Sequence, residues 1–145
     1  MEVFEISNEG ELDKLANYLL LNYPDRRIFA MSGPLGAGKT TFIKYLAKQL
    51  GSIDSVRSPT YTLANMYKTD GGKKIYHLDL FRIRDVAEWI DIGIDDYIAD
   101  PNAVVFIEWP EKIRDLLPTD ITLFIHIKPD PKTQKRKIVI LLPDE

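Results

Sequence analysis

The chain has 145 residues, 45% of them hydrophobic and 28% charged, and a formal net charge of -3 at pH 7. This length and composition predict one domain, residues 1–145, with a hydrophobic core, in a cytoplasmic protein that does not associate with membranes. The lack of cysteine excludes disulfides and thiolate metal sites, and the acidic balance argues against autonomous nucleic-acid binding, which needs a strongly basic domain.

The N-terminal segment predicts a strand followed by a helix. Residues 2–6 (EVFEI) favour the strand. Asn8 can cap the helix, because Glu11 stands three positions later in the spacing of a capping box. Apolar residues share one face of this helix: Leu12, Leu15, Ala16, Leu19 and Leu20. Pro24 is expected to stop it.

A phosphate-binding loop pattern follows. Residues 33–40 (GPLGAGKT) match a glycine, four free positions, a second glycine, a lysine and Ser or Thr. The apolar residues 28–32 before it read as a buried strand, and an amphipathic helix follows and ends at Gly51. The motif requires this order of strand, loop and helix.

The residue types of this loop suit a phosphate chain. Glycines let backbone N–H groups turn toward the anion, and the helix that begins near Lys39 adds its N-terminal N–H groups. Lys39 would reach the β- and γ-phosphates, Thr40 would ligate Mg²⁺, and Thr41 would donate a further hydrogen bond. A turn that merely caps a helix is the alternative, but it has no use for the Lys-Thr pair. The predicted nucleotide-binding residues are Gly33, Leu35, Gly36, Ala37, Gly38, Lys39, Thr40 and Thr41.

The rest of the chain alternates between strands and helices. The expected elements are a strand over about 61–68, a hairpin turn over 69–74, a strand over 74–81, a helix over 87–92, a turn over 94–98, an apolar strand over 103–108, a short helix between Pro110 and Pro118, and strands over 121–127 and 135–142. The fold class is α/β: a three-layer P-loop NTPase-like domain with a mixed, mainly parallel central sheet and an antiparallel hairpin.

Two acids compete for a metal role. Glu108 ends the apolar strand, where a carboxylate is costly unless it faces a wet or metal-bearing crevice; otherwise it would cap the next turn. Asp79 is the second candidate, with a local role as the alternative: accepting from a backbone N–H or pairing with Arg82. Either acid can hold Mg²⁺ or orient the attacking water.

Further candidates are weaker on sequence alone. Thr60, in the segment SPTYT, lies where a switch loop can sense a γ-phosphate, although a proline-initiated loop explains the segment as well. Trp109 can stack on a base or a partner, or simply pack. The basic stretch 132–137 has two interpretations. A solvated hairpin whose lysines protect an edge strand is favoured over a contact with a partner or RNA. We find no arginine whose context marks it as an arginine finger.

Five segments together resemble the TsaE family, also called YjeE, in order and approximate spacing. They are GPLGAGKTT (33–41), SPTYTL (58–63), HLDLFR (77–82), IGIDDY (92–97) and EWPE (108–111). The resemblance covers nearly the whole chain. Phe81 departs from it, since the family more often has Tyr there.

The resemblance implies an ATPase required for threonylcarbamoyladenosine in tRNAs that read codons beginning with A. It would convert ATP to ADP and phosphate with Mg²⁺, slowly alone and faster with its partners TsaB and TsaD, and would meet tRNA only indirectly. Lys39, Asp79 and Glu108 would be catalytic, Thr40, Asp79 and Glu108 would serve the metal, Thr60 would lie in a switch-like loop and Trp109 would complete the site.

Three rivals stay open. A small-molecule or nucleoside kinase shares the loop, but no arginine-rich lid is evident. A GTPase would need an Asn-Lys-x-Asp segment, which is missing. A regulatory module would bind nucleotide without catalysis.

Overall fold

The computed structural model describes residues 1–59 and 62–142. Its strands are β1 (Glu2–Ile6), β2 (Ile28–Ser32), β3 (Ala64–Lys68), β4 (Lys74–Asp79), β5 (Ala103–Glu108), β6 (Thr122–Pro129) and β7 (Arg136–Leu141). Its helices are α1 (Glu9–Asn22), α2 (Lys39–Gln49), α3 (Val86–Ile92) and α4 (Ile94–Ala99), with short 3₁₀ turns at Pro110–Lys112 and Arg114–Leu116.

The strands over these residues form one seven-stranded sheet in the order β1-β7-β6-β2-β5-β4-β3. The central strands β6, β2, β5 and β4 run parallel to one another. β7 and β1 extend the sheet antiparallel on one side, and β3 forms an antiparallel hairpin with β4 on the other. This confirms the predicted mixed, mainly parallel sheet. The carboxyl ends of the parallel strands meet at one edge, where α/β proteins place their ligands.

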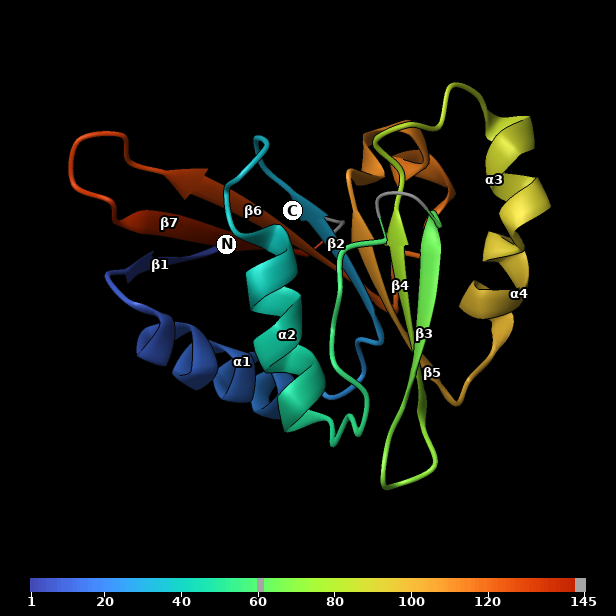
Figure 1. Cartoon of the computed structure of the whole chain (residues 1–145), viewed down its shortest axis with the longest axis horizontal. Coiled ribbons are helices and arrows are strands. Elements are labelled where there is room, and N and C mark those ends of the chain that lie inside the picture. The colour runs from blue at the N-terminus through green and yellow to red at the C-terminus, as the bar shows by residue number, and fades with distance from the viewer. Residues whose placement is uncertain (60–61, 143–145) are drawn as a thin grey trace.

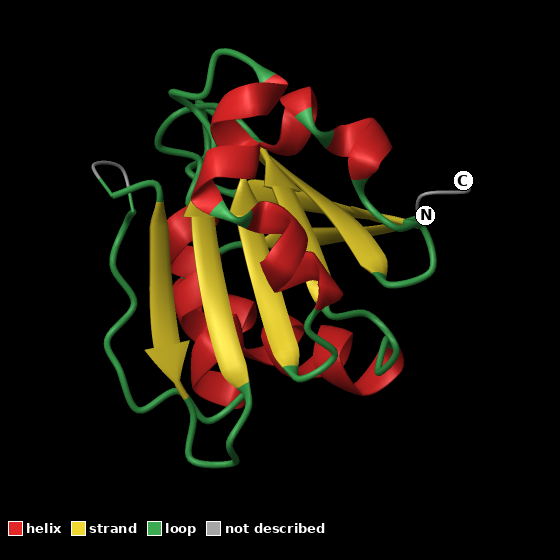
Figure 2. Cartoon of the chain, turned by 90° about the vertical axis from the view of Figure 1, so that its right-hand side faces the viewer, coloured by secondary structure: helices red, strands yellow, loops and turns green. Residues whose placement is uncertain are grey.

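Helices cover both faces of the sheet, as predicted for three layers. In Figure 1, α1 and α2 lie to one side of the strands and α3 and α4 to the other. Figure 2 shows the same layers with helices in front of and behind the sheet. Alternation along β2 explains this: Phe29 joins the core beneath α1 and α2, while Ile28 and Ala30 join the core beneath α4. A strand buried on both faces needs the continuous apolar run seen in the sequence.

The start of α1 matches its predicted cap. The Asn8 side chain accepts a hydrogen bond from the Glu11 backbone N–H at 3.1 Å, and the Glu11 carboxylate accepts from the Ser7 N–H at 3.2 Å. These contacts give side-chain acceptors to N–H groups at the helix start, where no carbonyl of a preceding helical turn is present.

Several local predictions differ from the structure. Residues 94–98 belong to the helix α4 rather than a turn, because Gly93 at φ 86° lets a new helix begin directly after α3. The helix predicted between the prolines is two 3₁₀ turns. The predicted strand 74–81 ends at Asp79, whose side chain accepts from the Phe81 N–H and turns the chain. β7 is flanked by β1 and β6, so the basic stretch does not guard an edge strand.

Among the helices described for this chain, none combines the length and the apolar character needed to cross a membrane.

Candidate functional site

The loop between β2 and α2 has a backbone that glycine alone suits. Gly33 and Gly38 have φ values of 151° and 102°. A Cβ on Gly33 would stand 2.7 Å from the carbonyl oxygen of Ile127, and one on Gly38 would stand 2.6 Å from Nη1 of Arg136. The loop therefore packs closely against β6 and the start of β7, and a side chain at either glycine would force it away.

A cavity of about 290 Å³ opens at this loop, at the carboxyl edge of the sheet. The predicted site residues that line it are Leu35, Gly36, Ala37, Gly38, Lys39, Thr40, Thr41, Asp79, Glu108 and Trp109. Ser58 and Arg136 also line it. Gly33 lies beneath, where its carbonyl contacts Lys39. Thr60 falls outside the described residues, so its switch-like role stays a prediction.

Glu108 is the hub of the buried polar contacts. Its side chain ends β5 and is almost wholly buried. The Thr40 hydroxyl donates to Glu108 Oε2 at 2.8 Å, and His77 Nε2 lies 2.6 Å from the same oxygen. The 3₁₀ turn that follows has no side-chain cap, so Glu108 does not take the alternative role of capping it. The acid is directed at the phosphate loop instead.

A chain of hydrogen bonds continues from Glu108 through the sheet. His77 is fully buried, and its Nδ1 lies 2.9 Å from the Tyr67 hydroxyl. That hydroxyl lies 2.8 Å from the backbone oxygen of Arg57 and accepts from the Arg57 N–H at 3.0 Å. With Glu108 ionised, His77 donates from Nε2 and accepts at Nδ1. Glu108 is thereby linked to the backbone just before Ser58.

The roles of His77 and Tyr67 were not predicted. His77 lies two residues before Asp79, so strand alternation turns both side chains to the same face. That spacing was a usable signal for His77. Tyr67 offered none, because its contact depends on the pairing of β3 with β4.

Asp79 shares the cavity with Glu108, since the two residues are paired across β4 and β5. Asp79 Oδ1 accepts from the Phe81 N–H at 3.0 Å, so the predicted local role is present alongside the site position. Burial raises the pKa of Asp79; the Phe81 hydrogen bond opposes this, and the Glu108 charge adds to it. A cation between the two carboxylates would relieve this cost.

Lys39 is held beneath its own loop. Its Nζ donates to the carbonyls of Gly33 and Pro34, at 2.5 and 3.1 Å, and lies 3.9 Å from the centre of the Trp109 ring. Trp109, at φ 61°, also packs on Phe81 with ring centres 4.8 Å apart. Burial lowers the pKa of Lys39, while Glu108 and the other nearby acids oppose the shift. A phosphate beside the ammonium would stabilise its charge.

The oxygen donors fit Mg²⁺. Over the ranges 1–59 and 62–142, no three His, Asp or Glu side chains form a closed metal cluster. Mg²⁺ in nucleotide sites does not need one, since it keeps waters and binds one or two carboxylates together with phosphate oxygens. Thr40 and Glu108 already touch, with Asp79 in the same cavity, and these are the hard donors that Mg²⁺ prefers.

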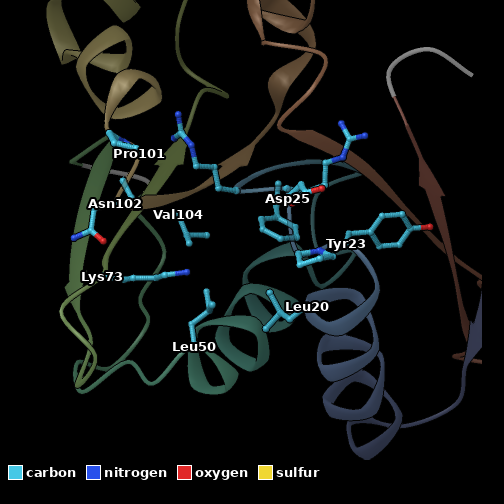
Figure 3. A pocket seen from close by; sticks show the side chains of 13 residues that line it. Leu20, Tyr23, Asp25, Leu50, Lys73, Pro101, Asn102 and Val104 are labelled. Atoms are coloured by element: carbon cyan, nitrogen blue, oxygen red, sulfur yellow. The ribbon is translucent and has the colours of Figure 1, made fainter.

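Another hollow, of about 320 Å³, lies at the opposite edge of the sheet. Figure 3 shows Leu20, Leu50, Lys73 and Val104 reaching into it from separate elements. It contains none of the predicted site residues. The predicted site residues therefore gather at the phosphate loop and not in this hollow.

Comparisons with known proteins agree on one family. The family model "Threonylcarbamoyl adenosine biosynthesis protein TsaE" matches residues 6–138. The chain is 39% identical over 121 residues to the tRNA threonylcarbamoyladenosine biosynthesis protein TsaE of Haemophilus influenzae. The aligned region covers 82% of this chain and 75% of that one. The corresponding Aquifex aeolicus protein is 38% identical over 135 residues, 90% of this chain and 91% of that one. The crystal structure of Bacillus subtilis YdiB has a TM-score of 0.69 at 26% identity, covering 97% of this chain and 85% of that one.

Proposed function

The chain belongs to the TsaE family of tRNA threonylcarbamoyladenosine biosynthesis proteins, and from this premise we propose that it binds and hydrolyses ATP for that modification. The observation that carries the proposal is the 2.8 Å contact between Thr40 and Glu108. It joins the first turn of the helix after a phosphate loop to an acid at the end of the neighbouring strand. ATP-hydrolysing P-loop proteins hold the Mg²⁺ of their nucleotide between these two positions.

Each side chain then has a distinct task. The loop N–H groups and the N-terminus of α2 bind the phosphates, and Lys39 leaves its loop carbonyls to neutralise phosphate oxygens. When bound, Mg²⁺ would be held by Thr40 and Glu108 and would neutralise charge on the β- and γ-phosphates. Among the described residues, Asp79 is in register with Glu108 but makes no hydrogen bond to Thr40, and its Oδ1 accepts from the Phe81 N–H, so we assign it the orientation of the attacking water.

The same proposal includes partners. We propose that the chain acts on the TsaB and TsaD proteins, with slow hydrolysis alone and faster hydrolysis in their presence. The net charge of -3 supports a division of labour in which another chain holds the tRNA.

The test is ATP hydrolysis with Mg²⁺ by the purified chain, alone and with TsaB and TsaD, beside a Lys39→Ala control. Stimulation that disappears in the control would support a partner-dependent ATPase. A rate unchanged by TsaB and TsaD would overturn the partner proposal. Transfer of phosphate to a small acceptor rather than water would replace it with a kinase.

A further inference from the structure

An arginine faces the phosphate loop from the side away from the two acids. Arg136 begins β7 and lines the loop cavity. The sheet order places β5 and β4, with Glu108 and Asp79, on one side of β2, and β6 and β7 on the other. The cavity therefore has an acidic wall and, across the loop, a cationic one.

The guanidinium of Arg136 lies against Gly38. A Cβ built on Gly38 would stand 2.6 Å from Nη1, 3.0 Å from Cζ and 3.5 Å from Nε. Three guanidinium atoms at similar range indicate that the whole group, rather than one nitrogen, covers this glycine. Gly38 is the residue from which α2 starts.

A cation at this place is unfavourable on its own. The N-terminus of a helix carries a partial positive charge, and Lys39 adds a full one. In the part of the chain that the structure describes, the Arg136 guanidinium takes part in none of the hydrogen bonds and ion pairs. The guanidinium, with its five N–H donors, thus lies beside a positive helix end without an acceptor among the described residues, an arrangement that an anion would stabilise.

The neighbouring lysines do not share this position. Lys135 pairs with Glu5 at 3.6 Å, and Lys137 is in register with the same glutamate across β1 and β7. Neither lysine lines the loop cavity. Strand alternation turns Lys137 to the face opposite Arg136. Within this basic run, Arg136 alone has been turned toward the loop.

We propose that Arg136 binds phosphate oxygens that ATP and ADP share. The inference rests on the proposed nucleotide binding. The γ-phosphate and the attacking water belong beside Asp79 and Glu108, whereas Arg136 stands over Gly38 across the loop. Arg136 therefore contributes to nucleotide affinity and little to bond cleavage, which separates it from an arginine finger.

Calorimetric titration with MgADP tests this on the full chain, with variants Arg136→Gln, Arg136→Lys and the matched control Lys137→Gln. Loss of a charge-assisted hydrogen bond predicts about tenfold weaker binding or more for Arg136→Gln. Arg136→Lys should recover part of the lost affinity, because lysine keeps the positive charge but cannot form the paired hydrogen bonds of a guanidinium. Lys137→Gln should bind as the unaltered chain does.

The salt dependence of binding and the kinetics of hydrolysis test the same inference. Affinity of the unaltered chain should fall more steeply with salt than affinity of Arg136→Gln. In hydrolysis assays, KM should rise in Arg136→Gln while kcat stays within about twofold. Equal MgADP affinity of the unaltered chain and Arg136→Gln, with Lys39→Ala weakened, would overturn this inference alone. Failure of the unaltered chain to bind MgADP would overturn the proposed function as well.

Discussion

At the scale of single residues, the site holds two carboxylates in unlike surroundings. Glu108 receives hydrogen bonds from Thr40 and His77, whereas Asp79 receives one from its own turn. The first acid is fixed to the phosphate loop and the second is not. This difference supports our proposal that Glu108 holds the metal and that Asp79 orients the water.

Replacing Glu108 by Gln keeps the size and the Thr40 contact but removes the charge. We expect hydrolysis to fall by about 100-fold or more, and the Mg²⁺ concentration for half-maximal rate to rise. Asp79→Asn should lower kcat without that shift in Mg²⁺ dependence. Steady-state rates across a Mg²⁺ titration measure both, with the exposed Asp115→Asn as control. If only Asp79→Asn shifts the Mg²⁺ dependence, the two roles are reversed.

Replacing Tyr67 by Phe removes its hydroxyl and leaves its packing. The His77 Nδ1 and the Arg57 N–H then lose a buried partner, so the free energy of unfolding should fall by about 1–3 kcal/mol. Since His77 fixes Glu108, kcat should fall several-fold while KM changes little. Tyr18→Phe is the matched control, because it breaks a contact with Glu2 far from the site. An equal effect of both variants on kcat would show that Tyr67 serves stability only.

At the scale of elements, local sequence signals place the helices and strands that carry the loop. Strand β2 and helix α2 flank the glycine motif in the order that a phosphate-binding loop requires, and the strand β5 is an almost wholly apolar run. The ends of helices and strands are harder to predict from sequence than their presence. Gly93 redirects the chain through its positive φ value, and Asp79 redirects it through a side-chain hydrogen bond. Propensity over a window does not register such events.

The cap of α1 gives a prediction at this scale. Asn8→Ala should lower the free energy of unfolding by about 1 kcal/mol, because the Glu11 N–H loses its side-chain acceptor and keeps only the Asn8 backbone oxygen. Asn8→Asp should keep most of the stability, since its carboxylate can accept the same bond. Urea unfolding measures both. Nucleotide affinity should not change in either variant, and a loss would mean that α1 supports the loop more directly than its contacts indicate.

At the scale of the whole molecule, the order of the strands brings together residues that lie far apart in the sequence. Glycines and Lys39 are read from one motif, but Arg136 reaches Gly38 only because β7 lies beside β6 and β6 beside β2. Tyr67 reaches His77 only through the register of β3 and β4. The sequence therefore predicted the fold class and the loop with its acids, and missed the partners that come from distant strands.

The acidic wall makes the stability of the whole molecule depend on pH. Asp79 ordinarily titrates near 3.8, and burial raises its pKa in the folded state. Asp79 therefore stays protonated to a higher pH in the folded state than in the unfolded state. The free energy of unfolding of the nucleotide-free protein should accordingly fall as the pH rises from 3.8 through the raised pKa. Asp79→Asn should remove this loss and melt higher than the unaltered chain at pH 7. Thermal melts from pH 4 to 8 check it, and parallel curves for both proteins would contradict it.

The position of the Trp109 ring beside the Lys39 ammonium makes Trp109 an intrinsic fluorescence reporter. The indole is one of two in the chain, and an ammonium lies 3.9 Å from its ring centre. When phosphate draws that ammonium away, the electric field at the indole changes, and with it the colour and yield of its fluorescence. Occupancy of the loop should then be visible in the unlabelled protein, in real time and during turnover.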